Sequence, residues 1–138
     1  MESSHQLKMF TLQEANELIP RLHDLIEKLK NKRDDISALE MEIDVLEVLA
    51  QSSSEKAPSA QVEAKLAEYE KSVNEFYTLI EEVHGTGCFL KSIESGLVDF
   101  YTVYKGRVVY LCWRFGEPEI TTWHDIGHGY GSRQPLDL

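Results

Sequence analysis

The sequence lacks long apolar runs. No stretch approaches the roughly 18 apolar residues that a membrane-spanning helix needs, and residues 1–8 contain no apolar segment of the kind found in signal peptides. We therefore expect a cytoplasmic protein that does not enter the membrane.

Cysteine is also scarce, since Cys88 and Cys112 are the only two. Their spacing matches no common zinc motif. In a reducing compartment, two such thiols are typical of small buried side chains rather than of a disulfide.

Positive charge is in deficit. The 14 lysines and arginines stand against 24 aspartates and glutamates, which gives a formal net charge of −10. A chain with this charge repels phosphate backbones and anionic lipid, so the composition argues against nucleic acid and membrane surfaces as partners.

The residues that are present have the composition of a globular protein. Hydrophobic residues make up 42% and charged residues 28% of the 138 positions, which supplies a core and a large solvated surface. A chain of this length suits one folding unit, so we expect residues 1–138 to form a single domain of the α+β class.

A helical segment is predicted to begin after Thr11. Thr11 and Glu14 have the spacing of a capping box, in which each side chain accepts the other residue's backbone N–H. Pro20 removes a backbone hydrogen bond and disfavours helical geometry before it, which predicts a short first helix or a kink and then a longer helix. Apolar residues recur in steps of three and four at Ala15, Leu18, Leu22, Leu25, Leu29, Ile36, Leu39, Ile43, Leu46 and Ala50, with Lys32 as the single polar member.

A second helix is predicted after a serine-rich segment at residues 51–59, which is short enough to reverse the chain. It begins near Ala60 and ends at His84, with Gly85 as the expected left-handed cap. Its apolar stripe has the same period and consists of Val62, Leu66, Tyr69, Val73, Phe76, Ile80 and Val83.

Because the two stripes match, residues 11–84 are expected to form a long antiparallel helical hairpin. The packing would be that of an intramolecular coiled coil, with Lys32 facing Glu75, Glu81 or Glu82. Two copies of the chain could also form a homodimer through apolar surface of the hairpin that remains exposed.

The sequence period changes from helical to alternating after Gly85. Lys105 and Gly106 are typical of a tight two-residue turn, which makes a hairpin the firmest prediction of this region. Residues 85–124 are therefore expected to form a small antiparallel β-meander of three or four strands, at residues 88–91, 97–104, 107–115 and 120–124. The apolar side of the third strand should pack on residues 12–19, and it consists of Val109, Leu111, Trp113 and Phe115.

Residues 125–138 form the predicted glycine-rich tail. Gly127, Gly129 and Gly131 disfavour both helix and regular strand, so we expect a loop. Backbone N–H groups of this loop and the Arg133 guanidinium could bind a carboxylate or phosphate. In the alternative, Arg133 only fixes the tail by pairing with an acidic residue such as Asp99 or Glu117.

Polar side chains near the start of this tail suggest a divalent metal site. His124 and His128 have the spacing of two zinc ligands on one helical face, but the glycines argue against a helix there. A looser site for zinc or another divalent ion combines one or both histidines with Glu117, Asp125 or Cys112. In the alternative, His124 bonds to the backbone and His128 is exposed to solvent.

Motifs along nearly the whole chain carry a family resemblance. They are Phe10-Thr-Leu-Gln-Glu-Ala-Asn16, Gly96-Leu-Val-Asp-Phe100, Leu111-Cys-Trp113, Gly116-Glu117, Trp123-His124 and Gly129-Tyr-Gly-Ser-Arg133. In these motifs the chain resembles a small prokaryotic family catalogued as domain-of-unknown-function family 2203, which has no established activity. The pattern of that family includes Asp99, Cys112, Trp113, Glu117, Trp123, His124, Gly131 and Arg133, and it does not include His128.

Three functional hypotheses follow. The first is a non-enzymatic binding module for a protein or a small anionic ligand, with a polar pocket where the hairpin meets the sheet. Its binding residues would be Asp99, Glu117, Trp123, His124 and Arg133. The second is a small metal-dependent hydrolase, in which His124 and Glu117, with Asp125 and His128, hold an ion that activates water. The third is a purely structural coiled-coil assembly protein.

Overall fold

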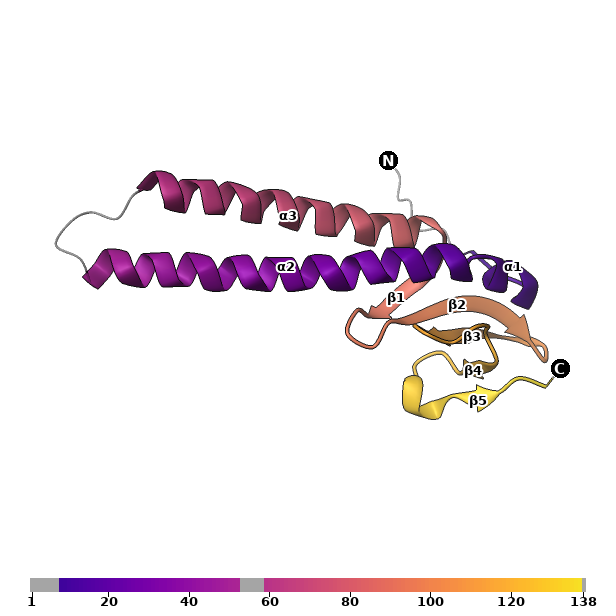
Figure 1. The fold of residues 1–138 in the computed structure, drawn as a ribbon. Coiled ribbons are helices and arrows are strands. Elements are labelled where there is room, and N and C mark those ends of the chain that lie inside the picture. The colour runs from indigo at the N-terminus through magenta and orange to yellow at the C-terminus, as the bar shows by residue number, and fades with distance from the viewer. Residues whose placement is uncertain (1–7, 53–58, 138) are drawn as a thin grey trace. The chain divides into compact units, whose positions relative to one another are not determined.

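The computed structural model describes residues 8–52 and 59–137. Within these ranges the helices are α1 (Leu12–Glu17), α2 (Ile19–Ser52) and α3 (Ser59–Gly85). The strands are β1 (Phe89–Ser92), β2 (Leu97–Tyr104), β3 (Arg107–Arg114), β4 (Thr122–His124) and β5 (Gln134–Pro135), with the single turn of 3-10 helix η1 (Tyr130–Ser132) before β5 (Figure 1). The fold is α+β as predicted, with a long helical hairpin of α2 and α3 and a five-strand antiparallel sheet.

The first helix begins as the sequence predicts. The Thr11 hydroxyl oxygen accepts the Glu14 N–H at 3.0 Å, and the Glu14 carboxylate accepts the Thr11 N–H at 2.9 Å, which completes the capping box. Helix α1 ends at Glu17, and α2 begins at Ile19, directly before Pro20. The predicted short helix followed by a long one is confirmed.

Part of the predicted apolar stripe is buried along the hairpin, whereas Leu66, predicted to belong to the α3 stripe, is 46% exposed. Leu39 and Ile43 of α2 are buried, and the Lys32 ammonium lies 2.7 Å from the Glu75 carboxylate on α3. Glu75 is thus the partner of Lys32 among the three acids predicted. Residues 53–58 of the predicted connection lie outside the described residues, and coiled-coil packing of the hairpin stays a prediction.

The end of α3 differs from the prediction. Gly85 does not have a positive φ, so the expected left-handed cap at this position is wrong. Gly87 adopts that conformation instead, with φ of 102°, and its N–H donates to the His84 carbonyl at 3.0 Å. The left-handed residue comes two positions later than predicted. Before it, the Thr86 N–H donates to the Val83 carbonyl at 3.2 Å.

The strands are hydrogen-bonded in chain order, which confirms the meander. Lys105 and Gly106 both have positive φ, 51° and 83°, so the tight turn between β2 and β3 has the left-handed backbone that a twisted hairpin favours. β4 is shorter than predicted and begins at Thr122. The reason is that the Ile120 N–H donates to the Asn16 side-chain oxygen at 2.8 Å and not to β3.

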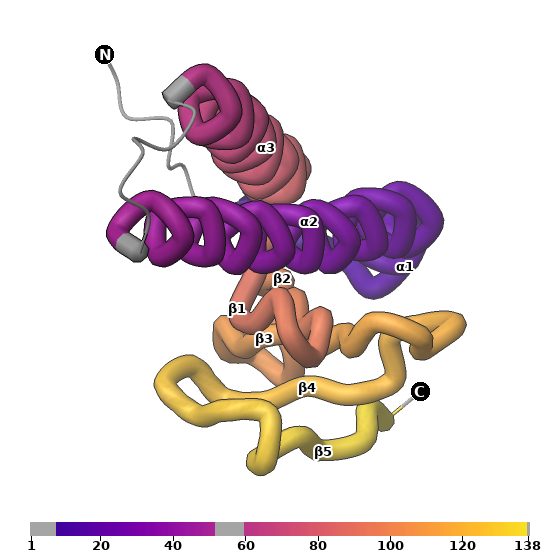
Figure 2. The backbone as a smooth tube through the Cα atoms, turned by 60° about the vertical axis from the view of Figure 1, so that its left-hand side comes forward, coloured from indigo at the N-terminus to yellow at the C-terminus, as the bar shows by residue number. Residues whose placement is uncertain are grey.

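The C-terminal segment is not the loop that its glycines predict. Gln134 and Pro135 form β5 and pair with β4, which makes five strands instead of three or four. Figure 2 shows the chain leaving β4, turning, and returning beside it. Of the three glycines, only Gly127 has a positive φ. Gly129 directly precedes η1 and Gly131 lies within it, and β5 follows.

One face of the sheet carries the apolar core. Cross-strand partners share a face, and the pairs Val98 with Trp113 and Phe100 with Leu111 are all buried. The Phe10 ring contacts the Phe100 ring edge-on at 5.2 Å, and the Phe115 ring stacks on His23 of α2 at 4.5 Å. Phe10, before α1, and His23, near the start of α2, therefore contact residues of this face or at its end, on either side of the predicted residues 12–19.

The chain divides into two compact units. One comprises Met1–Glu27 and Ile80–Leu138, and the other comprises Lys28–Leu79. The first unit contains the whole sheet and the candidate site. Among the described residues, no helix combines the length and apolar character needed to cross a bilayer.

Candidate functional site

Three side chains that bear chemistry meet on the second face of the sheet. Asp99 of β2 pairs in register with Cys112 of β3, and Cys112 pairs with Thr122 of β4. His124 lies two residues beyond Thr122, and side chains two residues apart in a strand share a face. The side chains of Asp99, Cys112 and His124 therefore project to the side opposite Phe100 and Trp113.

All three side chains are withdrawn from solvent. Asp99 is 3% exposed, Cys112 is 1% and His124 is 2%. One ligand atom from each lies within 4.8 Å of the other two. Because these ligand atoms lie so close together, this group could hold a metal.

The hydrogen bonds of His124 fix its ring. A backbone carbonyl only accepts hydrogen bonds, so the contact of 3.0 Å between Nδ1 and the Asp125 carbonyl places a proton on Nδ1. Nε2 lies 3.1 Å from Oδ2 of Asp99. One proton between Nε2 and Oδ2 completes this second bond, and the Asp99–His124 pair then has no net charge.

Burial dominates the titration of the carboxyl and the thiol. It raises the pKa of Asp99, and the neighbouring His124 offsets only part of that effect. Burial, reinforced by the charge of Asp99, raises the pKa of the Cys112 thiol to about 12. At neutral pH, Cys112 is therefore a protonated thiol in the protein as it stands.

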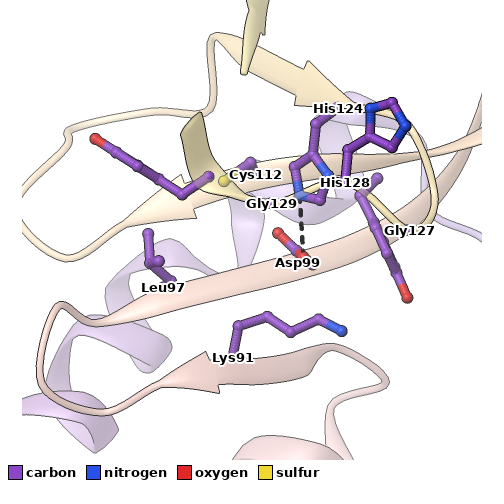
Figure 3. Close-up of a pocket in the computed structure, with 10 residues that line it drawn as sticks. Lys91, Leu97, Asp99, Cys112, His124, Gly127, His128 and Gly129 are labelled. Atoms are coloured by element: carbon purple, nitrogen blue, oxygen red, sulfur yellow. Dashed lines mark hydrogen bonds and ion pairs between the residues drawn. The ribbon is translucent and has the colours of Figure 1, made fainter. Parts of the chain in front are cut away.

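A pocket of about 450 Å³ lies over this group (Figure 3). Asp99, Cys112 and His124 line it together with Lys91, Leu97, Tyr110, Gly127, His128, Gly129 and Tyr130. The loop that follows β4 thus forms one wall of the pocket, and β1 supplies Lys91 on another side.

Lys91 brings positive charge to the pocket. Its ammonium lies 4.9 Å from the centre of the Tyr110 ring and 5.7 Å from that of Phe89, both within the range of cation–π attraction. Tyr110 in turn stacks on Tyr101 at 4.8 Å. These aromatic contacts hold the Lys91 side chain against the sheet at the edge of the pocket.

A second polar cluster fixes the segment around η1. Arg133 donates to both carboxylate oxygens of Glu117, at 3.2 and 3.1 Å, and to the Tyr130 hydroxyl at 2.8 Å. Glu117 also accepts the Arg114 N–H at 2.7 Å, and its carbonyl accepts the Trp113 indole N–H at 2.9 Å. The predicted pairing of Arg133 with an acidic residue is present, and Glu117 is that residue.

The candidate residues predicted from the sequence do not all lie on the same face of the sheet. Trp123 projects from the other face than His124, because they are adjacent in β4, and its ring contacts Tyr104 at 5.1 Å. Asp125 pairs with Arg107 at 2.7 Å. His128 is exposed and lines the pocket.

The group that could hold a metal contains His124 and Cys112, both named for the looser predicted site, and takes Asp99 in place of Glu117, Asp125 and His128. The pairing of Asp99 with Cys112 was readable from the sequence. A two-residue turn at Lys105 and Gly106 places Tyr104 opposite Arg107, and counting outward along both strands then brings Asp99 opposite Cys112. No comparable signal marks Lys91, because the β1–β2 register shifts between Leu90 and Ser92.

The two cysteines provide a direct test of this burial. At pH 8 iodoacetamide should alkylate Cys112 of the native protein about 10³-fold more slowly than free cysteine, because the pKa of about 12 leaves correspondingly little thiolate. Cys88, with a pKa raised by burial to about 11, should also react slowly. Mass spectrometry of timed samples measures both rates. Rapid labelling of Cys112 in the folded protein, at the rate seen in urea, would contradict the burial described.

Comparison with known proteins identifies the family. The family model described as "Uncharacterized conserved protein (DUF2203)" matches residues 8–136, so the chain belongs to this family. No curated protein and no solved structure matches the chain.

Proposed function

We propose that this member of the DUF2203 family is a binding module that takes a small organic anion into the pocket over Asp99 and His124. The observation that carries the proposal is a pocket of about 450 Å³ whose floor consists of the buried side chains of Asp99, Cys112 and His124. Small-molecule sites have volumes of roughly 300–1,000 Å³ and place a few convergent polar groups among apolar and aromatic side chains.

The sign of the ligand's charge follows from the pocket lining. Asp99 and His124 share one proton and together carry no net charge, as the hydrogen bonds of His124 require. The Lys91 ammonium then supplies the fixed charge of the lining, and it is positive. A carboxylate on the ligand can pair with Lys91, while the Tyr110 and Tyr130 rings can contact its apolar part.

The first sequence hypothesis placed the pocket where the hairpin meets the sheet. The proposal here uses instead the pocket on the sheet face opposite Phe100 and Trp113, and it keeps Asp99 and His124 from the predicted binding residues. Glu117 and Arg133 support the proposal indirectly, because their ion pair and the Arg133–Tyr130 contact hold one wall of the pocket. The two free cysteines are typical of a reducing compartment, which supports the cytoplasm as the place of action.

The proposal also gives the hairpin a role. We infer that α2 and α3 pack as an antiparallel coiled coil that serves as scaffold. The buried Leu39 and Ile43 and the Lys32–Glu75 ion pair support this packing.

A thermal-shift screen with small mono- and dicarboxylates tests the binding function. An anion that binds should raise the melting temperature, and Lys91→Met should lower its affinity at least about tenfold, since the ion pair is lost while the side-chain length is kept. Lys71→Met is the matched control, because Lys71 is an exposed lysine of α3 outside the pocket lining. If a stabilising anion binds Lys91→Met as tightly as the unchanged protein, the proposed pairing of the anion with Lys91 is wrong. If no anion in the screen raises the melting temperature, the proposal that the pocket binds a small organic anion is wrong.

A further inference from the structure

We propose that Asp99, Cys112 and His124 form a three-ligand site for a divalent transition metal ion, with zinc as the expected occupant. This site uses residues of the pocket floor, but it does not depend on the binding of an organic anion. Its support comes from the donor atoms, their mutual distances and the orientation of the histidine.

The donor atoms are a carboxylate oxygen, a thiol sulfur and an imidazole nitrogen. This mixture suits zinc, which binds oxygen, nitrogen and sulfur ligands, whereas magnesium and calcium take oxygen ligands almost alone. Zinc bonds of about 2.0–2.3 Å imply distances of about 3.3–3.8 Å between ligand atoms in a tetrahedral site. Nε2 of His124 and Oδ2 of Asp99 are already 3.1 Å apart, and all three ligand atoms lie within 4.8 Å of one another. Small side-chain rotations therefore bring the three to one ion.

The histidine is held in the orientation that a metal ligand needs. Histidines that bind metals usually donate the other ring N–H to a carbonyl or carboxylate, which fixes the tautomer and aims the free nitrogen. Here Nδ1 donates to the Asp125 carbonyl at 3.0 Å, and Nε2 is directed toward Asp99 (Figure 3). Because backbone supplies this bond, the orientation of the ring does not depend on another side chain.

The exchange of protons for a divalent ion conserves charge. Without metal, one proton lies between Nε2 and Oδ2 and one is on the Cys112 sulfur, so the three groups together are neutral. Binding of Zn²⁺ displaces both protons and forms bonds to the carboxylate, the thiolate and the neutral imidazole, and the sum is again zero. Neutrality matters here because a net charge in a buried site is costly. The charge next to Lys91 of the pocket lining is therefore the same with and without the ion.

The ion would keep one position open. Three protein ligands leave the fourth tetrahedral position of zinc for water or an external ligand, as in catalytic rather than structural zinc sites. All three ligands line the same pocket, so this position would face the space above them. The predicted ligands Glu117, Asp125 and His128 are not among the three residues whose ligand atoms meet here.

Cobalt(II) titration of the metal-free full-length protein tests the site. We expect one ion per chain, an intense near-ultraviolet band from thiolate-to-cobalt charge transfer, and displacement of cobalt by one equivalent of zinc. In weakly buffered solution at pH 6.5, zinc binding should release about two protons per ion, whereas binding to exposed neutral histidines releases fewer.

Two cysteine variants make the test specific. Cys112→Ser should abolish the charge-transfer band and weaken zinc binding at least about tenfold, while Cys88→Ser, which alters the other buried thiol, should retain both. Circular dichroism checks that each variant folds, and Cys112→Ala, which also removes the thiol, replaces Cys112→Ser if that variant does not. A band that persists in Cys112→Ser, or a folded wild-type protein that binds no stoichiometric zinc, would overturn the proposal. Because these readouts use metal alone, they fail or succeed independently of the carboxylate screen.

Discussion

Asp99→Ala is expected to lower the free energy of unfolding of the metal-free protein by about 3 kcal/mol. Asp99 is the hydrogen-bond partner of Nε2 of His124, and both side chains are almost completely buried. Removing the carboxyl leaves the buried imidazole nitrogen without its protein partner. Urea unfolding followed by circular dichroism at pH 7 measures the loss.

Asp99→Asn is the matched control for this prediction. Its amide can donate to Nε2 while Nδ1 keeps its bond to the Asp125 carbonyl, so we expect a cost below about 1 kcal/mol. Equal losses in the alanine and asparagine variants would show that the hydrogen bond to His124 contributes little.

The pH dependence of the same pair has a definite sign. Burial raises the pKa of Asp99 in the folded state, so the folded protein keeps this proton to a higher pH than the unfolded chain does. The stabilising contribution is therefore complete below the ordinary carboxyl pKa of about 3.9 and is lost as pH rises through the raised value. Asparagine does not titrate, so the stability of the wild type relative to Asp99→Asn should fall as pH rises above about 4. A difference that stays constant from about pH 4 to 8 would contradict this.

Trp113→Ala should have the larger effect, with a loss of about 3–5 kcal/mol in the free energy of unfolding. The Trp113 side chain is fully buried on the helix-facing side of the sheet, and its indole N–H donates to the Glu117 carbonyl at 2.9 Å. The substitution creates a large cavity and also releases the turn that carries Glu117. Because stabilities of whole domains are roughly 5–15 kcal/mol, the variant should melt at a much lower temperature.

Two further substitutions separate these contributions. Trp113→Phe retains most of the buried ring area and loses the N–H bond, so about 1–2 kcal/mol is expected. Tyr77→Ala removes an aromatic ring that is 60% exposed, and its effect should be below about 1 kcal/mol. A Tyr77→Ala loss as large as that of Trp113→Ala would mean that the core is not centred on the sheet as described.

Local features of the sequence determined several elements of this protein directly. Thr11 and Glu14 fix the start of α1 because the capping box involves residues only three apart, and Pro20 separates α1 from α2 through its own ring and missing N–H. Lys105 and Gly106 fix the register of β2 on β3, and with it the juxtaposition of Asp99 and Cys112.

The tertiary structure alone decided how the candidate site is completed. His124 reaches Asp99 because β4 pairs with β3 in the register that sets Thr122 opposite Cys112 and His124 opposite Tyr110. Trp123 lies on the opposite face because it is adjacent to His124 in the same strand. Gln134 and Pro135, which follow the glycines, form an edge strand because they pair with β4. These outcomes depend on contacts between distant residues. Local propensity determined the elements, whereas long-range hydrogen bonds and packing determined which side chains share a pocket.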